Sequence, residues 1–103
     1  MDMAFQNINV RQIVPTAISL DAIMVDVRAP EQFRKGHIPM AVPLPMQRIE
    51  RKQVTLPKNK TLIVYCETGG TSMKAARMLD EMGYKVINCV GGLKDYRGSV
   101  TRR

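Results

Sequence analysis

Residues 61–82 read TLIVYCETGGTSMKAARMLDEM, which is an apolar run, a cysteine, a short polar loop and a helical pattern in succession. The apolar run 61–65 predicts a buried strand, and apolar residues spaced three or four apart predict a helix over 72–82. Thr71 or Ser72 is expected to cap this helix and Gly83 to end it. The segment therefore indicates an α/β unit in which Cys66 stands between a strand and a helix N-terminus.

The position of Cys66 indicates a reactive thiol. The first amides of a helix lack intrahelical partners, and together with loop amides they form a concavity that suits negative charge. A sulfur held there is favoured as the thiolate, whereas a buried cysteine acting as a small hydrophobe is the alternative. We therefore predict Cys66 as the catalytic residue. The loop that follows is predicted to bind substrate, and its residues are Glu67, Thr68, Gly69, Gly70, Thr71 and Ser72.

Short apolar runs alternate with helical patterns along the rest of the chain, which favours an α/β domain with a parallel sheet. Further strands are expected at 7–9, 22–27 and 86–89, with a brief edge strand around 42–44. Further helices are expected at 30–36, 45–53 and near 93–97, and Pro15 predicts a short or broken helix within 10–19. With no repeat or low-complexity linker, the chain is expected to form one domain over 1–103, with a core of about 7–97 and a basic tail at 98–103.

The net charge of +7 over 103 residues favours acidic partners and disfavours self-association, so a monomer is expected. The basic residues are not interleaved with the few aromatic ones, which argues against nucleic-acid binding. The first residues do not resemble a secretory signal, and no apolar run approaches the roughly 18 residues of a membrane helix. Two distant cysteines and a single histidine provide neither a disulfide framework nor a metal site. A cytoplasmic location is the default expectation.

Six motifs follow one another in a specific order and spacing. They are Asp26-Val27-Arg28, Glu31-Gln32-Phe33, residues 36–41 (GHIPMA), the strand leading to Cys66, the helix from Ser72 to Gly83-Tyr84, and the strand leading to Gly91-Gly92. In this order they resemble a rhodanese-like (sulfurtransferase) domain over roughly residues 7–97.

The resemblance implies a single rhodanese-like domain, a doubly wound parallel sheet of about five strands with helices on both faces. It implies that Cys66 takes a sulfane sulfur from a donor such as thiosulfate, a persulfide or a polysulfide. The sulfur is held as a persulfide and passed to a thiol or cyanide acceptor, without a cofactor or metal. The basic surface suits an acidic sulfur-relay protein as a further partner.

The chain departs from the family pattern in the loop and at two further positions. Family loops often carry an arginine where this chain has Thr71, and Glu67 is acidic, so a dianionic donor is expected to bind weakly. Met40 stands where a glycine is common and Tyr96 where a tryptophan is common, and both are interpreted as packing changes.

The remaining polar and sulfur-bearing residues are assigned structural roles. Arg28 is expected to pair with Glu31, and His37 to tie a loop by hydrogen bonding. Cys89 is interpreted as a core residue, with a resolving thiol as the alternative. Gly69 and Gly70 are expected to shape the anion pocket, and Gly91 and Gly92 to turn the chain beside it.

Two other functions share this fold. One is a non-catalytic rhodanese-like sulfur carrier or regulatory binding module, which the arginine-free loop keeps open. The other is a phosphatase or arsenate reductase, in which an arginine stands at the position of Ser72 and binds the oxyanion. The serine here disfavours that second function.

Overall fold

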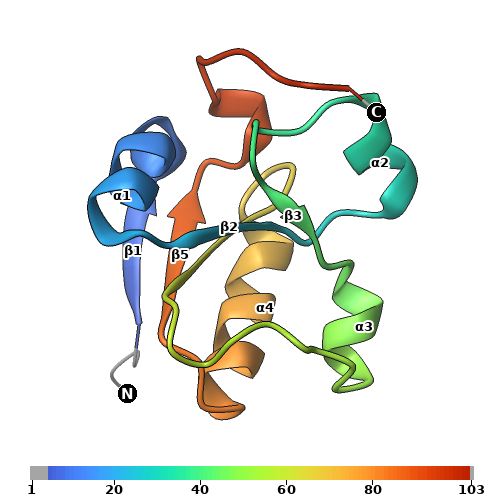
Figure 1. The fold of residues 1–103 in the computed structure, drawn as a ribbon. Helices are drawn as coiled ribbons and strands as arrows, with labels where there is room; N and C mark the ends of the chain where they lie inside the picture. Colours follow the sequence, from blue (N-terminus) through green and yellow to red (C-terminus); the bar gives the residue numbers. More distant parts are fainter. Residues whose placement is uncertain (1–4, 103) are drawn as a thin grey trace.

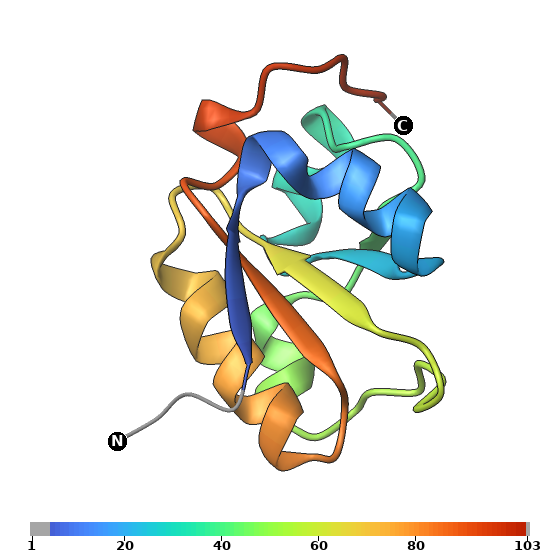
Figure 2. The same cartoon turned by 90° about the vertical axis from the view of Figure 1, so that its left-hand side faces the viewer.

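Five parallel strands form one sheet in the order β1-β5-β4-β2-β3 (Figures 1 and 2). The structure is a computed structural model that describes residues 5–102. The strands are β1 (Gln6–Asn9), β2 (Ile23–Asp26), β3 (Val42–Pro43), β4 (Leu62–Tyr65) and β5 (Val86–Val90). The helices are α1 (Ile13–Leu20), α2 (Pro30–Lys35), α3 (Met46–Glu50) and α4 (Gly70–Glu81), with 3-10 turns η1 (Val10–Gln12) and η2 (Leu93–Asp95). The predicted doubly wound α/β sheet is confirmed.

The sheet separates two apolar clusters, one on each face. Residues of β2, β4 and β5 pack on one face against α3 and α4, represented by Ile49, Ala76 and Leu79. The alternate residues of the same strands pack on the other face against α1, represented by Ile13 and Ala17. Figure 2 shows the twisted sheet with α4 on one side and α1 on the other. Every residue of β4 is buried, which explains its uninterrupted apolar sequence. Within residues 5–102 no helix has the length and apolarity needed to cross a membrane.

The segment predicted as a short or broken helix is divided at its start. Residues 10–12 form η1, and α1 begins at Ile13. Pro15 consequently lies in the first turn of α1, where the missing N–H leaves no intrahelical bond unmade. The prediction for this segment is confirmed. The helix expected over 45–53 is shorter, because α3 ends at Glu50.

Helix α4 begins at Gly70, two residues earlier than predicted. Gly69 is its N-cap residue, with a φ of 107° and no side-chain cap bond. Thr71 and Ser72 therefore lie inside the first turn, and the prediction that one of them caps the helix is wrong. The C-terminal prediction is confirmed, because Gly83 has a φ of 96° and the Tyr84 amide donates to the Leu79 carbonyl at 3.0 Å.

The C-terminal segment returns to the body of the domain. Thr101 and His37 exchange backbone hydrogen bonds of 2.9 and 2.8 Å as an isolated antiparallel bridge. Figure 1 shows this segment running across the top of the molecule toward α2. These contacts lie within the segment 98–103 that was expected to form a basic tail, and Arg103 lies outside the described residues.

Met40 occupies a turn position that favours glycine. The Ala41 amide donates to the Ile38 carbonyl at 3.0 Å, Pro39 is the second residue of this turn, and Met40 has a φ of 75°. These features define a type II turn, whose third residue needs a positive φ. The Met40 side chain is 86% exposed, so the interpretation of this position as a packing change is wrong. The glycine that is common at this position in the family adopts the positive φ of the turn without strain.

Met40→Gly is expected to stabilise the protein by about 0.5–1 kcal/mol, because relief of the left-handed strain exceeds the entropy cost of glycine. Denaturant unfolding measures the change. Met40→Ala is the matched control, since it removes the exposed side chain but keeps Cβ. Equal stabilisation by alanine would show that exposure of the side chain, rather than φ, determines the effect.

Candidate active site

The cleft with the predicted site residues lies where adjacent connections leave the sheet in opposite directions. The chain leaves β2 through α2 toward β3 and leaves β4 through α4 toward β5. Because all strands are parallel, the carboxyl ends of β2 and β4 meet at one edge, and the space between the diverging loops is open. The cleft has a volume of about 380 Å³, and its walls include Arg28, Gln32, Met46, Cys66 and Glu67. Proximity of Cys66 to this open edge follows from the strand order.

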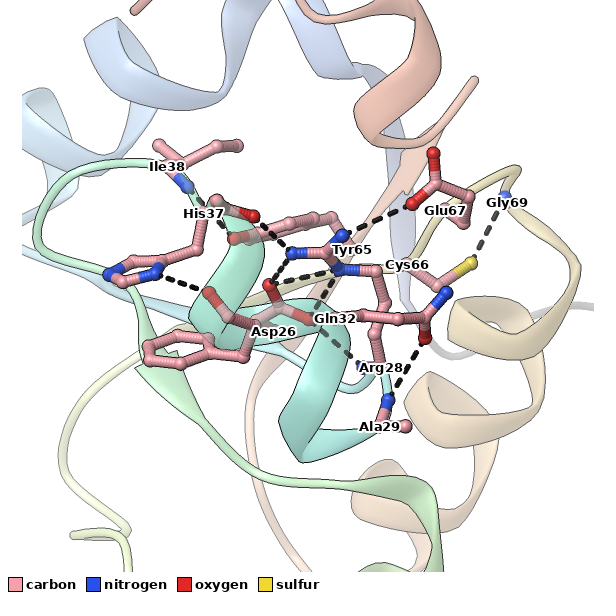
Figure 3. Close-up of polar contacts among 12 residues, drawn as sticks. Asp26, Arg28, Ala29, Gln32, His37, Ile38, Tyr65, Cys66, Glu67 and Gly69 are labelled. Carbon is pink, nitrogen blue, oxygen red and sulfur yellow. Dashed lines mark hydrogen bonds and ion pairs between the residues drawn. The ribbon is translucent and has the colours of Figure 1, made fainter. Parts of the chain in front are cut away.

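The Cys66 sulfur lies under the loop amides, as predicted. Its Sγ accepts hydrogen bonds from the Gly69 amide at 3.0 Å and the Ser72 amide at 3.2 Å (Figure 3 shows the first). The residue is 3% exposed and belongs to the cluster beneath α4, yet it forms part of the cleft wall. Two backbone donors at the N-terminus of α4 therefore face the sulfur.

The predicted loop residues divide into those that face the cleft and those that support the sulfur. Glu67, Thr68 and Thr71 line the cleft. Gly69 and Ser72 do not line it, but their amides hold Cys66 Sγ, and the buried Ser72 hydroxyl donates to the Gly69 carbonyl at 3.2 Å. Gly70 does neither.

Glycine is required at position 69 but not at position 70. Gly69 has a left-handed φ of 107°. A Cβ built on Gly70 would meet no atom within 4 Å, and its φ is not positive. The prediction that both glycines shape the pocket is therefore confirmed for Gly69 alone.

The segment after β5 braces the loop from behind. The Leu93 amide donates to the Cys66 carbonyl at 2.8 Å, and the Lys94 amide to the Glu67 carbonyl at 3.2 Å. Gly92 approaches so closely that an added Cβ would lie 2.3 Å from the Glu67 carbonyl oxygen, and its φ is 65°. The expected turn at Gly92 is thus also a close backbone contact that positions the loop.

Arg28 is the cleft residue whose role the sequence did not reveal. Its Nε and Nη2 bind the Asp26 carboxylate at 2.8–3.1 Å, Nη2 also donates to the Gly36 carbonyl at 2.7 Å, and Nη1 donates to Glu67 Oε1 at 3.1 Å (Figure 3). The predicted pairing with Glu31 is wrong. Burial alone would lower the pKa of Arg28, but the hydrogen bonds and charge of Asp26, with Glu67, raise it above its ordinary value.

Two aromatic side chains beside this network have structural roles. His37 Nδ1 lies 2.8 Å from the Phe33 carbonyl and its ring stacks on that of Phe33, which confirms the prediction that His37 ties a loop. The Tyr65 hydroxyl accepts from the Ile38 amide at 3.1 Å. Burial, and then the charge of Asp26, raise the pKa of Tyr65, so its hydroxyl stays protonated.

Cys89 lies in the apolar cluster on the face of the sheet opposite Cys66. It is fully buried, and burial raises the pKa of its thiol to about 12. A protonated thiol in the opposite cluster fits the interpretation as a core residue and gives no support to a resolving thiol. Within residues 5–102 no group of three or more potential ligands is placed to hold a metal ion.

Burial of Cys89 predicts a loss of stability in alkali. The thiol ionises near pH 9 in the unfolded chain and near pH 12 in the folded one, so above pH 9 only the unfolded chain releases the proton. The stabilisation is complete below about pH 9 and is lost as pH rises toward 12, by roughly 1.4 kcal/mol for each pH unit.

Cys89→Val removes this titration while keeping an apolar side chain. Denaturant unfolding of both proteins between pH 8 and about 11 is expected to show wild type losing stability faster than the variant. Ionisation of Tyr65 is common to both proteins and cancels in the difference. Parallel loss of stability would contradict a buried, protonated Cys89.

Comparisons with known proteins agree with this geometry. The family model of the rhodanese-like domain matches residues 12–99. Thiosulfate sulfurtransferase PspE of Escherichia coli is 42% identical over 73 residues, 69% of this chain and 70% of that protein. A sulfurtransferase of Allochromatium vinosum is 36% identical over 74 residues, 71% of this chain and 69% of that protein.

A solved structure shows the same fold. The rhodanese-like domain protein from Staphylococcus aureus has a TM-score of 0.82 and 25% identity, and the match covers 96% of this chain and 99% of that one. The names of the sequence relatives support a rhodanese-type sulfurtransferase or sulfur carrier. The chain therefore belongs to the rhodanese-like domain family.

Proposed function

We propose that this protein is a sulfurtransferase that carries sulfane sulfur as a persulfide on Cys66. The observation that carries the proposal is the pair of amides, Gly69 and Ser72, that donate to Cys66 Sγ at the wall of an open cleft. A thiolate stabilised in this way is a nucleophile for sulfur–sulfur bonds. The names of the sulfurtransferase relatives support the same chemistry.

The reaction has two displacements. The Cys66 thiolate attacks the outer sulfur of thiosulfate, a new sulfur–sulfur bond forms, and sulfite leaves with the electron pair of the broken bond. A cyanide ion or a thiolate then attacks the terminal sulfur of the persulfide. The product is thiocyanate or a new persulfide, and the Cys66 thiolate is restored with no net oxidation of the enzyme.

The loop amides suit both stages. The Gly69 amide ends the loop and the Ser72 amide belongs to the first turn of α4, so both donors are held by backbone structure. The persulfide is itself anionic, and the same donors can hold its terminal sulfur as they hold Sγ.

A sulfur carrier is the alternative. It would form the same persulfide without rapid turnover, and it would exchange sulfur with a partner protein instead of a small donor and acceptor. The phosphatase alternative finds no support, because Ser72 occupies the arginine position and its hydroxyl is directed to the Gly69 carbonyl. An oxyanion would lack the cation that this reaction needs there.

Intact-mass spectrometry after incubation with thiosulfate or a polysulfide tests the proposal. One added sulfur atom is expected, peptide mapping is expected to place it on Cys66, and cyanide is expected to remove it. Multiple turnovers with cyanide would identify a catalyst, and a single stoichiometric release a carrier. Sulfur found on Cys89, or on neither cysteine, would exclude the proposed function.

A further inference from the structure

We propose that Glu67 is a built-in competitor for anions at Arg28, so that this ion pair determines which donors the cleft accepts. The inference rests on the proposed function, because it concerns the selectivity of the same cleft. Arg28 Nη1 is the anion subsite, and the Glu67 carboxylate occupies it in the structure (Figure 3).

The contacts of Arg28 separate a fixed part from an exchangeable part. Nε and Nη2 are held by Asp26 and by the Gly36 carbonyl. Within residues 5–102, Nη1 donates to Glu67 alone. The guanidinium is therefore anchored on one side, and its other side presents N–H donors to the cleft that Cys66 also lines.

The two carboxylates that bind Arg28 differ in exposure. The Asp26 side chain is fully buried, so it cannot leave Arg28 without placing an unpaired charge in the core. The Glu67 side chain is 47% exposed and can exchange Arg28 for water at small cost. Glu67 is therefore the partner that an incoming anion displaces.

A hollow beside the cleft can accommodate the Glu67 carboxylate after it is displaced. Arg28, Gln32 and Glu67 line both the Cys66 cleft and a neighbouring hollow of about 400 Å³. Lys35 also lines that hollow and supplies a second cation near Glu67. Because Arg28 and Cys66 line the same cleft, a donor with its reacting sulfur at Cys66 can place an anionic group on Arg28 while Glu67 turns toward the hollow.

The consequence is a threshold for anionic donors. A group such as the sulfonate end of thiosulfate must first displace Glu67, which weakens its binding. A donor that places no anionic group at Arg28 leaves the Arg28–Glu67 ion pair intact, so its binding is not weakened in this way. The glutamate thus disfavours small dianions relative to less charged persulfides, even though a cation lies in the cleft.

Sulfate binding tests this inference without requiring sulfur transfer. The dissociation constant is measured by amide chemical-shift titration of Gly69 and Ser72 at low ionic strength. Glu67→Gln keeps a neutral acceptor for Nη1 and is expected to tighten sulfate binding by about threefold, whereas Glu67→Ala empties the subsite and is expected to tighten it by about tenfold. Added salt is expected to shrink both gains.

Glu50→Gln is the matched control. Glu50 is also paired with a basic residue, Lys74, and is 46% exposed, but it does not line the cleft. Its removal makes the same change in net charge and is expected to alter sulfate binding less than twofold. No gain at position 67 beyond this control, or equal gains for alanine and glutamine, would overturn competition at Arg28.

Persulfide formation from thiosulfate is measured separately on the same variants. Tighter sulfate binding without any persulfide would support the anion subsite and reject the proposed function. Persulfide formation with unchanged sulfate binding would support the proposed function and reject the anion subsite.

Discussion

Cys66→Ser is expected to reduce sulfur transfer to the uncatalysed background while the fold remains intact. A hydroxyl is not ionised at neutral pH and cannot form the persulfide, so the first displacement loses its nucleophile and the second loses the persulfide that the acceptor attacks. The serine oxygen is smaller than sulfur and can still accept from the Gly69 and Ser72 amides, so the loop keeps its partners. Steady-state formation of thiocyanate from thiosulfate and cyanide measures the loss, and circular dichroism and thermal unfolding report the fold.

Cys89→Val is the control for the loss of a thiol as such. Cys89 lies in the other apolar cluster, so its replacement is expected to leave turnover within about twofold of wild type. Wild-type turnover in the Cys66 variant would refute the persulfide mechanism. Loss of turnover in both variants, with the fold intact, would point to a role for Cys89 in the reaction.

Arg28→Met is expected to lower the free energy of unfolding by about 3–5 kcal/mol. Methionine keeps most of the apolar stem but removes the guanidinium, which leaves the fully buried Asp26 carboxylate without its partner. The Gly36 carbonyl also loses its donor. Denaturant unfolding at neutral pH measures the change. The effect is large because the charge that remains cannot reach water.

Lys60→Met is the control, because Lys60 pairs with an Asp21 side chain that is 92% exposed. That substitution is expected to cost less than about 1 kcal/mol. Asp26→Leu combined with Arg28→Met is expected to recover part of the loss, since no unpaired charge then remains. If Arg28→Met cost no more than Lys60→Met, the Asp26–Arg28 pair would not hold this edge of the sheet together.

The cleft contains a cation that the sequence of the loop does not reveal. The loop was expected to carry a carboxylate and no cation, so that a dianionic donor would meet repulsion alone. Arg28 comes from the end of β2 and binds the same carboxylate at 3.1 Å. Glu67 therefore acts on an anionic donor in two ways, by repelling it and by occupying Arg28. Only variants at position 67 separate the two effects.

The strand, the loop and the helix around Cys66 were predictable from sequence because their causes are local. Alternation of apolar runs with helical spacing places β4 and α4, and a cysteine directly after a strand faces the first amides of the next helix. The helix start was missed by two residues because the backbone of Gly69, rather than a side chain, forms the N-cap. The interpretation of Met40 as a packing change is wrong because the spacing of residues in a motif does not specify their φ angles.

The partner of Arg28 Nη1 was decided by the tertiary structure alone. Glu31 is three positions away in sequence, but Glu67, 39 positions away, is the residue that Nη1 binds. The parallel pairing of β2 with β4 aligns Asp26 with Tyr65, and this register brings the residues just beyond both strands to one edge of the sheet. Separation along the chain does not encode that register, because it results from packing apolar residues on both faces of the sheet. Cys66 and its loop are thus a property of the local sequence, whereas the charge that faces them is a property of the assembled sheet.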